Sequence, residues 1–219
     1  MQDHDSRRGH GSIQGQLAPF VLAMAFVVVA SNYLVQYPVQ ASFGELNLAD
    51  LLTWGAFTYP VAFLVTDLAN RRLGAFKARI IVFVGFLIAV LLSVLLATPR
   101  IAVASGTAFI VAQLLDVSIF DRLRHSHWWH APLISSILGS LLDTALFFTL
   151  AFSAQLSVLG PNDPFAIEIV PFAGVVFDDM PRWMSWAIGD LCVKLLVALT
   201  MLAPYRAIIG WMHPLRTPA

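Results

Sequence analysis

The sequence predicts an all-α integral membrane protein with six transmembrane helices and both termini in the cytoplasm. Apolar residues make up 58% of its 219 residues and charged residues only 12%, about half the charged share of an ordinary soluble domain. The apolar residues gather in long segments that suit a helical span of about 20 residues. Lys and Arg are concentrated in alternate connecting segments, which is typical of cytoplasmic loops.

The charge balance and the single cysteine narrow the classes of function. Thirteen basic residues balance thirteen acidic ones, so no overall positive field predicts a nucleic-acid partner. Cys192 is the one cysteine, which excludes an internal disulfide and CxxC metal or redox motifs. We therefore expect no metal, no cofactor and no nucleic acid, and we expect the lipid bilayer to surround the chain.

The N-terminal region combines a polar tail with a first apolar segment. Residues 1–16 contain Asp, Arg, Gly and Ser and predict a disordered cytoplasmic tail. The segment at about 17–36 is too long for the core of a signal peptide and lacks a small-residue cleavage site. We expect it to be a retained first span that ends before Pro38, because proline cannot continue a helix.

Five further apolar segments complete the predicted bundle. We expect spans at about 51–68, 80–97, 101–119, 132–152 and 183–209. Their lengths suit helices and exceed the roughly ten residues of a barrel strand. With the first span they form one transmembrane domain over residues 17–209, which a cytoplasmic tail at 210–219 follows.

The connecting segments set the predicted orientation. Ten Lys and Arg residues fall before span one, in the loops after spans two and four, and at the C-terminal end from Arg206 onward, whereas only Arg100 and Arg182 fall in the opposite loops. Since basic residues favour the cytoplasmic side, both termini are expected inside. The long segment 153–182 is then an external loop, and its apolar stretch 165–177 is expected to lie on the surface or to dip into the membrane.

Three ionisable residues are expected deep in the membrane. Asp143 lies in the fifth predicted span, and Asp190 and Lys194 lie four residues apart in the sixth, on one helix face. A charge at bilayer depth costs about 2.5–3.5 kcal/mol on insertion scales, so such residues face the bundle interior and have partners. Two interpretations of the Asp190–Lys194 pair stay open: a structural salt bridge, or a pair that lines a polar cavity and loosens when a ligand arrives.

Asp67 and Asp116 are interpreted differently, because they lie near the predicted cytoplasmic ends of spans two and four. The basic residues that follow them are Arg71, Arg72, Arg122 and Arg124. This arrangement favours interfacial ion pairs that anchor the helix ends.

Polar and aromatic side chains on three spans suit a planar solute that forms hydrogen bonds. In span five, Ser136, Ser140 and Asp143 recur at helical spacing; packing through small residues explains the serines but not the carboxylate. Asn32 and Gln36 share one face of span one. Amides and carboxylates can bind the edge of such a solute, while aromatic rings stack on its face.

Span two contains a proline within its apolar sequence. Pro60 leaves the carbonyl of Ala56 without its helical donor, so we expect a kink or an unwound turn at this point.

No catalytic signature accompanies these residues. HExxH, GxSxG and P-loop patterns are absent from the sequence, so no metalloprotease, hydrolase or nucleotide-hydrolysing site is predicted. The histidines between residues 125 and 130 lack Cys or carboxylate partners at a zinc-ligand spacing, and a basic interfacial loop is expected there. We expect a protein that is not an enzyme.

Several short motifs occur together along the chain. They are Ser31-Asn32-Tyr33-Leu34-Val35-Gln36, Thr53-Trp54-Gly55-Ala56-Phe57, Gln113-Leu114-Leu115-Asp116, Asp143-Thr144 and Phe147-Phe148, with Asp190 and Lys194. In combination they resemble the vitamin-uptake-like family, whose best-known members are bacterial queuosine precursor transporters. The likeness covers most of the chain and is weakest between residues 153 and 182.

The resemblance implies import of 7-deazaguanine precursors of the tRNA base queuosine across the bacterial inner membrane. The substrates would be 7-cyano-7-deazaguanine and 7-aminomethyl-7-deazaguanine. It also implies a six-helix protein that works without its own ATPase and is similar in architecture to the substrate-binding subunits of energy-coupling-factor transporters.

For such a substrate, we expect Asp143 or Asp190 to bind the guanine-like edge. A carboxylate accepts two adjacent N–H donors, and each charge-assisted bond contributes about 1.5–3 kcal/mol. Lys194 would balance the charge of the empty site. The other expected contacts are amides from Asn32, Gln36 and Gln113 and rings from Trp54 and from Phe147 or Phe148.

Alternatives to this function stay open at the level of sequence. The chain could be the substrate-capture subunit of an energy-coupling-factor type vitamin or nucleobase transporter, which needs partner ATPases. A proton-coupled mechanism and facilitated diffusion are both compatible with the residues, as are a monomer and a homodimer.

Overall fold

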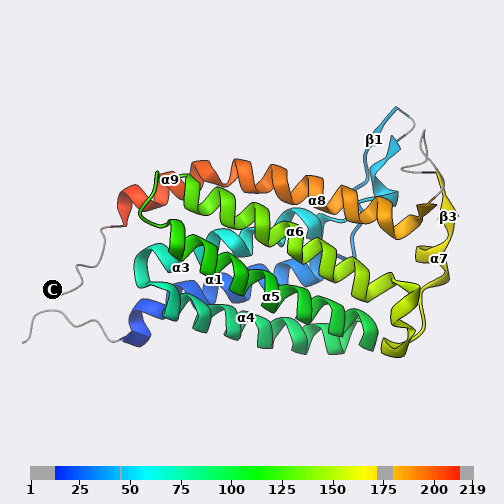
Figure 1. Cartoon of the computed structure of the whole chain (residues 1–219), viewed down its shortest axis with the longest axis horizontal. Helices are drawn as coiled ribbons and strands as arrows, with labels where there is room; N and C mark the ends of the chain where they lie inside the picture. Colours follow the sequence, from blue (N-terminus) through cyan, green and yellow to red (C-terminus); the bar gives the residue numbers. More distant parts are fainter. Residues whose placement is uncertain (1–12, 45, 172–179, 213–219) are drawn as a thin grey trace, which may run out of the picture.

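A computed structural model of the chain describes residues 13–44, 46–171 and 180–212, and its helices lie side by side in one bundle (Figure 1). Five helices among these residues are long and apolar enough to cross a membrane: Gly15–Leu34, Ala75–Leu96, Pro99–Leu123, His130–Phe152 and Arg182–Trp211. The chain is a mostly helical, multi-pass membrane protein, which confirms the predicted all-α membrane class. The predicted tails lie largely at residues 1–12 and 213–219, outside the described residues.

The long helices overlap the predicted spans and begin earlier than the apolar segments do. They are α1 (Ile13–Leu34), α4 (Ala75–Leu96), α5 (Pro99–Leu123) and α6 (His130–Phe152). A first turn tolerates polar residues, which hydropathy alone places outside a span. At the start of α5, the Thr98 hydroxyl accepts a hydrogen bond from the Ile101 N–H at 3.4 Å, and Pro99 occupies the first turn, where a missing N–H costs nothing.

The region predicted as the second span contains two helices, α2 (Trp54–Thr58) and α3 (Val61–Leu73). Pro60 separates them, because it has no N–H to donate to the preceding turn. The Tyr59 N–H still reaches Gly55 O at 2.9 Å, and the Ala62 N–H reaches Tyr59 O at 3.0 Å in a tighter turn. The predicted break at Pro60 is confirmed, and it places Tyr59 at the joint between the two helices.

The last predicted span consists of α8 (Arg182–Thr200) and α9 (Leu202–Trp211). The two follow each other with little interruption, since the Met201 N–H reaches Val197 O at 2.8 Å and the Tyr205 N–H reaches Met201 O at 3.0 Å. The start of α1 and the end of α9 lie at the same end of the bundle (Figure 1).

Short elements gather at the opposite end of the bundle (Figure 1). They are β1 (Ser42–Phe43), β2 (Leu46–Asn47), η1 (Leu48–Asp50), η2 (Ala154–Leu159), α7 (Pro164–Ile167), β3 (Ile169–Val170) and β4 (Met180–Pro181). The strands form two antiparallel pairs, β1 with β2 and β3 with β4. Part of the apolar stretch expected at 165–177 lies outside the described residues.

Arg100 links helices and loop at this end of the bundle, although the sequence predicted only a charged residue in an external loop. Its side chain is buried, and its guanidinium donates to three carbonyls: Leu150 O at 3.1 Å, Ser153 O at 2.6 Å and Gly160 O at 3.0 Å. These bonds tie the end of α6 and the following loop to the start of α5, and they supply donors to carbonyls at a helix end.

The packing of α3 on α6 depends on a small residue. A Cβ atom at Gly139 of α6 would lie 2.8 Å from the ring of Phe63, which is almost fully buried in α3. Small residues allow membrane helices to approach closely, and Gly139 does so here.

We expect Gly139→Ala to lower the free energy of unfolding by about 1–3 kcal/mol, because the added methyl group overpacks a filled core. Thermal unfolding of the detergent-solubilised protein measures this change. Gly210→Ala in α9 is the matched control, since a Cβ there meets no atom within 4 Å. Equal unfolding temperatures for the two variants would contradict this account of the α3–α6 contact.

Candidate functional site

A cavity of about 540 Å³ lies between helices in the half of the bundle next to α7. Its walls come from α1, α2, α4, α5, α6, α7 and α8 and from the short 3-10 helix η1. The volume falls within the range of about 300–1,000 Å³ that is typical of small-molecule sites. Most of the lining is apolar, whereas charged side chains gather around Lys194 at the deep end.

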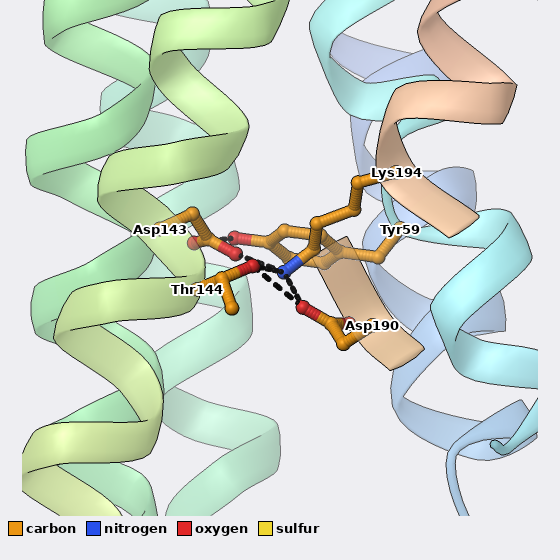
Figure 2. Close-up of polar contacts among 5 residues, drawn as sticks. All are labelled: Tyr59, Asp143, Thr144, Asp190 and Lys194. Atoms are coloured by element: carbon orange, nitrogen blue, oxygen red, sulfur yellow. Dashed lines mark hydrogen bonds and ion pairs between the residues drawn. The ribbon is translucent and has the colours of Figure 1, made fainter. Parts of the chain in front are cut away.

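Lys194 of α8 joins two carboxylates at this deep end. Its Nζ lies 2.6 Å from Asp143 Oδ2 on α6 and also contacts Asp190 Oδ2 on α8. Figure 2 shows the ammonium group between the two acids. The sequence spacing predicted the pairing within α8, and the structure adds the interhelix bond to Asp143.

Two hydroxyl groups complete the network (Figure 2). The Tyr59 OH donates to Asp143 Oδ1 at 3.1 Å. The Thr144 hydroxyl donates to Asp190 Oδ2 at 2.7 Å and lies 3.1 Å from Lys194 Nζ, from which it accepts a hydrogen bond. The network therefore connects α6, α8 and the α2–α3 joint through hydrogen bonds as well as charges.

The burial of the three charged side chains differs. Asp143 and Lys194 are each 4% exposed, whereas the Asp190 side chain is 17% exposed. All three line the cavity, so the group is an interhelix ion bridge and part of a polar cavity at once. Asp190 is the carboxylate that a bound solute reaches most easily.

The charge of the network favours ligands that donate hydrogen bonds. With all three groups ionised, two negative charges face one positive charge. Burying this arrangement is costly unless the remaining oxygen lone pairs find donors. An N–H-rich ligand edge in the cavity supplies such donors, and charge-assisted bonds are among the stronger hydrogen bonds in proteins.

Aromatic rings form the wall nearest to α7. Phe147 and Phe148 of α6 meet edge to face with their centroids 5.1 Å apart. Phe152 packs against Trp186 of α8 at 5.7 Å, and the Trp186 Nε1–H donates to Asp50 O at 2.7 Å. This last bond ties α8 to the segment between α1 and α2 at the mouth of the cavity, beside a surface suited to stacking.

The structure brings six of the eight proposed contact residues to this cavity. They are Asn32, Gln36, Asp143, Phe147, Asp190 and Lys194. The Asn32 Nδ2 group donates to Val28 O at 2.9 Å within α1. Trp54 lies outside the lining, about half exposed, and packs on Phe57 at 5.8 Å.

Gln113 also lies outside the cavity lining. It is completely buried in α5 and accepts a hydrogen bond from the Thr66 hydroxyl at 2.7 Å. This contact joins α5 to α3, away from the Lys194 network.

Tyr59, Thr144 and Trp186 belong to the site although sequence reasoning did not propose them as contacts. Tyr59 precedes the proline that interrupts its helix, and Thr144 follows a buried acid, so both had a local signal in the sequence. Trp186 has no comparable local signal in the sequence. Its position on the cavity wall depends on tertiary packing.

Asp67 and Asp116 do not form the predicted interfacial ion pairs. Both are buried, and the salt bridges of the described residues include neither. Arg71 instead donates to Tyr205 OH at 3.0 Å and to Arg124 O at 2.5 Å, while Arg124 pairs with Asp121. The prediction was wrong because proximity in sequence does not show where a long arginine side chain points.

A membrane bundle with a polar-ended cavity of this size defines the class of a small-molecule transporter. The chain belongs to the family described as "Putative vitamin uptake transporter", whose sequence model matches residues 53–98 and 91–208. It is a transporter and not an enzyme.

Two curated relatives are similar over most of their length. The queuosine precursor transporter of Escherichia coli (strain K12) is 34% identical, covering 84% of this chain and 81% of the relative. The "Probable queuosine precursor transporter" of Haemophilus influenzae (strain ATCC 51907 / DSM 11121 / KW20 / Rd) is 33% identical, covering 84% and 82%. No solved structure gives a significant match.

Removing the ammonium group tests the ion bridge. We expect Lys194→Met to lower the free energy of unfolding by about 3–5 kcal/mol, because two buried carboxylates lose their counter-charge. Asp143→Asn in the same chain should restore part of this loss. Thermal unfolding in detergent is the measurement.

Arg182→Gln provides the matched control for the lysine substitution. Its partner, Glu168, is 53% exposed, and pairs of this kind contribute about 0–1 kcal/mol. A Lys194→Met protein no less stable than Arg182→Gln would show that the bridge does not hold the bundle together.

Proposed function

We propose that this protein imports 7-deazaguanine precursors of queuosine, 7-cyano-7-deazaguanine and 7-aminomethyl-7-deazaguanine, across the bacterial inner membrane without its own ATPase. The curated relatives named as queuosine precursor transporters support the substrate class. The observation that carries the proposal is the cavity, in which paired carboxylates lie below an aromatic wall.

Asp190 is the proposed contact to the guanine-like edge. Among the described residues, both of its contacts, to Thr144 and to Lys194, use Oδ2, which leaves Oδ1 for a donor in the cavity. Asp143 is less exposed, and its two oxygens already accept from Lys194 and Tyr59. Asp143 then positions Lys194, while Asp190 accepts from the ligand.

Amide and aromatic groups would complete recognition of a flat base. Asn32 and Gln36 line the α1 side of the cavity, and Phe147 lines the α6 side. Amide groups read donors and acceptors along the edge of the base, and a phenyl ring stacks on its face.

Six membrane crossings with both termini in the cytoplasm fit this function. The broken pair α2–α3 would make the second crossing, and α8 with α9 would make the last. Support comes from the skew of basic residues and from the placement of the α1 start and the α9 end at one end of the bundle. In this orientation the cavity faces the outside, as an importer awaiting its substrate requires.

The surrounding lipid would contact the apolar outer surface of the bundle. On α4, Phe83, Leu87 and Leu91 are more than half exposed, and hydrocarbon is the medium in which such a surface is stable. Such a surface also suits a homodimer within the membrane.

We expect Asp190→Asn to weaken uptake of labelled 7-deazaguanine bases by about ten- to a hundredfold, because an amide accepts the base edge less strongly than a carboxylate. Uptake is measured in a host unable to make queuosine, whose tRNA is then assayed for the modified base. Asp143→Asn should also reduce uptake.

Glu168→Gln is the control for these carboxylate substitutions, because Glu168 is exposed and outside the cavity lining. Membrane levels of all variants are compared by immunoblot. Normal uptake in both Asp variants would overturn the assignment of the site.

The protein purified alone and reconstituted in vesicles should carry labelled base across the membrane without ATP. This result is expected because the cavity extends between the helices as far as the buried Lys194 network. Vesicles containing Asp190→Asn protein give the background. Tight binding without transport would instead favour a substrate-capture subunit with partner ATPases.

A further inference from the structure

A second buried polar cluster lies beyond the cavity, toward the end of the bundle where α1 starts and α9 ends. It contains Asp67 of α3, Asp116 of α5 and Ser135 of α6, all nearly or completely inaccessible to solvent. Asp116 is near enough to Asp67 for their negative charges to repel. The binding of a base in the cavity does not use these residues.

Hydrogen bonding leaves this cluster short of donors. Among the described residues, neither carboxylate oxygen of Asp116 has a hydrogen-bond partner. Ser135 lies beside both acids, but it has a single hydroxyl proton, for which Asp67 Oδ1 at 3.3 Å and Pro132 O at 3.4 Å are both acceptors. Two ionised carboxylates in such surroundings would be strongly destabilising.

The cationic groups around the cluster form their hydrogen bonds and ion pairs with other groups, although Arg71 is near enough for its positive charge to act on Asp67. The other charged and titratable side chains on α3, α4, α5, α6 and α9, with Arg124 directly after α5, are Arg71, Arg72, Lys77, Arg79, Arg100, Asp121, Arg122, Arg124, His130, Asp143, Tyr205 and Arg206. Arg71 reaches Tyr205 OH and Arg124 O, and Lys77 lies 3.5 Å from Gln16 Oε1. Arg206 lies over the ring of Trp128. No lysine or arginine in the described part of the chain forms an ion pair with Asp67 or Asp116.

A small void adjoins the cluster. It has a volume of about 10 Å³ and is lined by Asp67, Ser136 and Ser140, among others. Such a space holds about one water molecule. The Ser140 hydroxyl borders this void, is buried and has no hydrogen-bond partner among the described residues.

We propose that Asp67 and Asp116 form a proton-binding site that couples import of the base to the movement of a proton. A proton adds to one carboxylate oxygen and gives a neutral carboxylic acid, which can donate to the neighbouring carboxylate. Release of the proton regenerates the second negative charge. The inference rests on the proposed transport function and adds the ion that drives it.

One face of α6 connects the proton site to the cavity. Ser136, Ser140 and Asp143 follow each other at helical spacing, from the void beside Asp67 to the Lys194 network. The α2–α3 joint runs alongside, because Tyr59 contacts Asp143 while Pro60 lines the void. A rearrangement of the network on substrate binding therefore reaches the Asp67 cluster through two adjacent elements.

Infrared spectroscopy of the purified wild-type protein tests proton binding without any transport. We expect a carbonyl band of a buried carboxylic acid at neutral pH, which disappears in the Asp67→Asn, Asp116→Asn double variant and persists in Asp121→Asn. Asp121 is the control because its side chain is 42% exposed and paired with Arg124. Absence of the band in wild-type protein, or its persistence in the double variant, overturns the proposal.

Transport in reconstituted vesicles tests the coupling. For one proton per substrate, an inward gradient of one pH unit should drive about tenfold accumulation of labelled base by the wild-type protein. Asp116→Asn should still bind the base and equilibrate it but should lose the accumulation. Wild-type uptake that ignores the pH gradient, or that requires a sodium gradient instead, overturns the proton assignment.

The two proposals fail in different ways. Absence of both base binding and equilibration would refute the proposed transport function itself. Equilibration without accumulation under a pH gradient would leave that function intact and refute only proton coupling. Accumulation by the wild-type protein under a pH gradient tests proton coupling even if the Asp116→Asn variant does not fold.

Discussion

The bridge from Lys194 to Asp143 and Asp190 is the interaction on which the arrangement of the cavity depends. It joins α6 to α8 by a 2.6 Å ion pair between Lys194 and Asp143, whose side chains are each only 4% exposed. A lone ammonium or carboxylate at this depth would be costly, whereas Lys194 attracts both carboxylates. The need to pair the buried Lys194 with Asp143 therefore fixes the relative position of two helices.

The same interaction links structure to recognition. The partly exposed Asp190 lies where the cavity ends, and the aromatic wall of Phe147, Phe148 and Phe152 lies above it. A site built in this way combines an apolar chamber with a small number of placed acceptors, as binding sites for planar molecules generally do. Its polar end coincides with the ion bridge, and the proposed binding of a base uses the Asp190 oxygen that the bridge leaves available.

Sequence patterns predicted much of the fold because membrane helices obey simple physical rules. Length and hydropathy located the five candidate spans, and the covalent structure of Pro60 predicted the break between α2 and α3. Helical spacing predicted the Asp190–Lys194 pair. The cross-helix partner Asp143 could be singled out as a costly buried acid, but no spacing rule relates residues 143 and 194, so their contact required the structure.

Other parts of the site depend on the direction in which each side chain points, which the sequence does not specify. Arg71 follows Asp67 by one helical turn, yet its guanidinium turns to Tyr205 and Arg124. Gln113 and Trp54 have suitable chemistry but lie off the cavity lining. Side-chain type can be interpreted locally, whereas the choice among several possible partners is made by tertiary packing.

The close approach of α2 to α1 has a consequence for the capacity of the cavity. At Gly55, a Cβ atom would lie 2.8 Å from the backbone of Val35, and both residues border the chamber. The two walls can approach this closely because glycine has no Cβ atom. A larger residue at position 55 would push α2 away from the end of α1, so Gly55 helps to set the width of the cavity and the size of the solute that fits it.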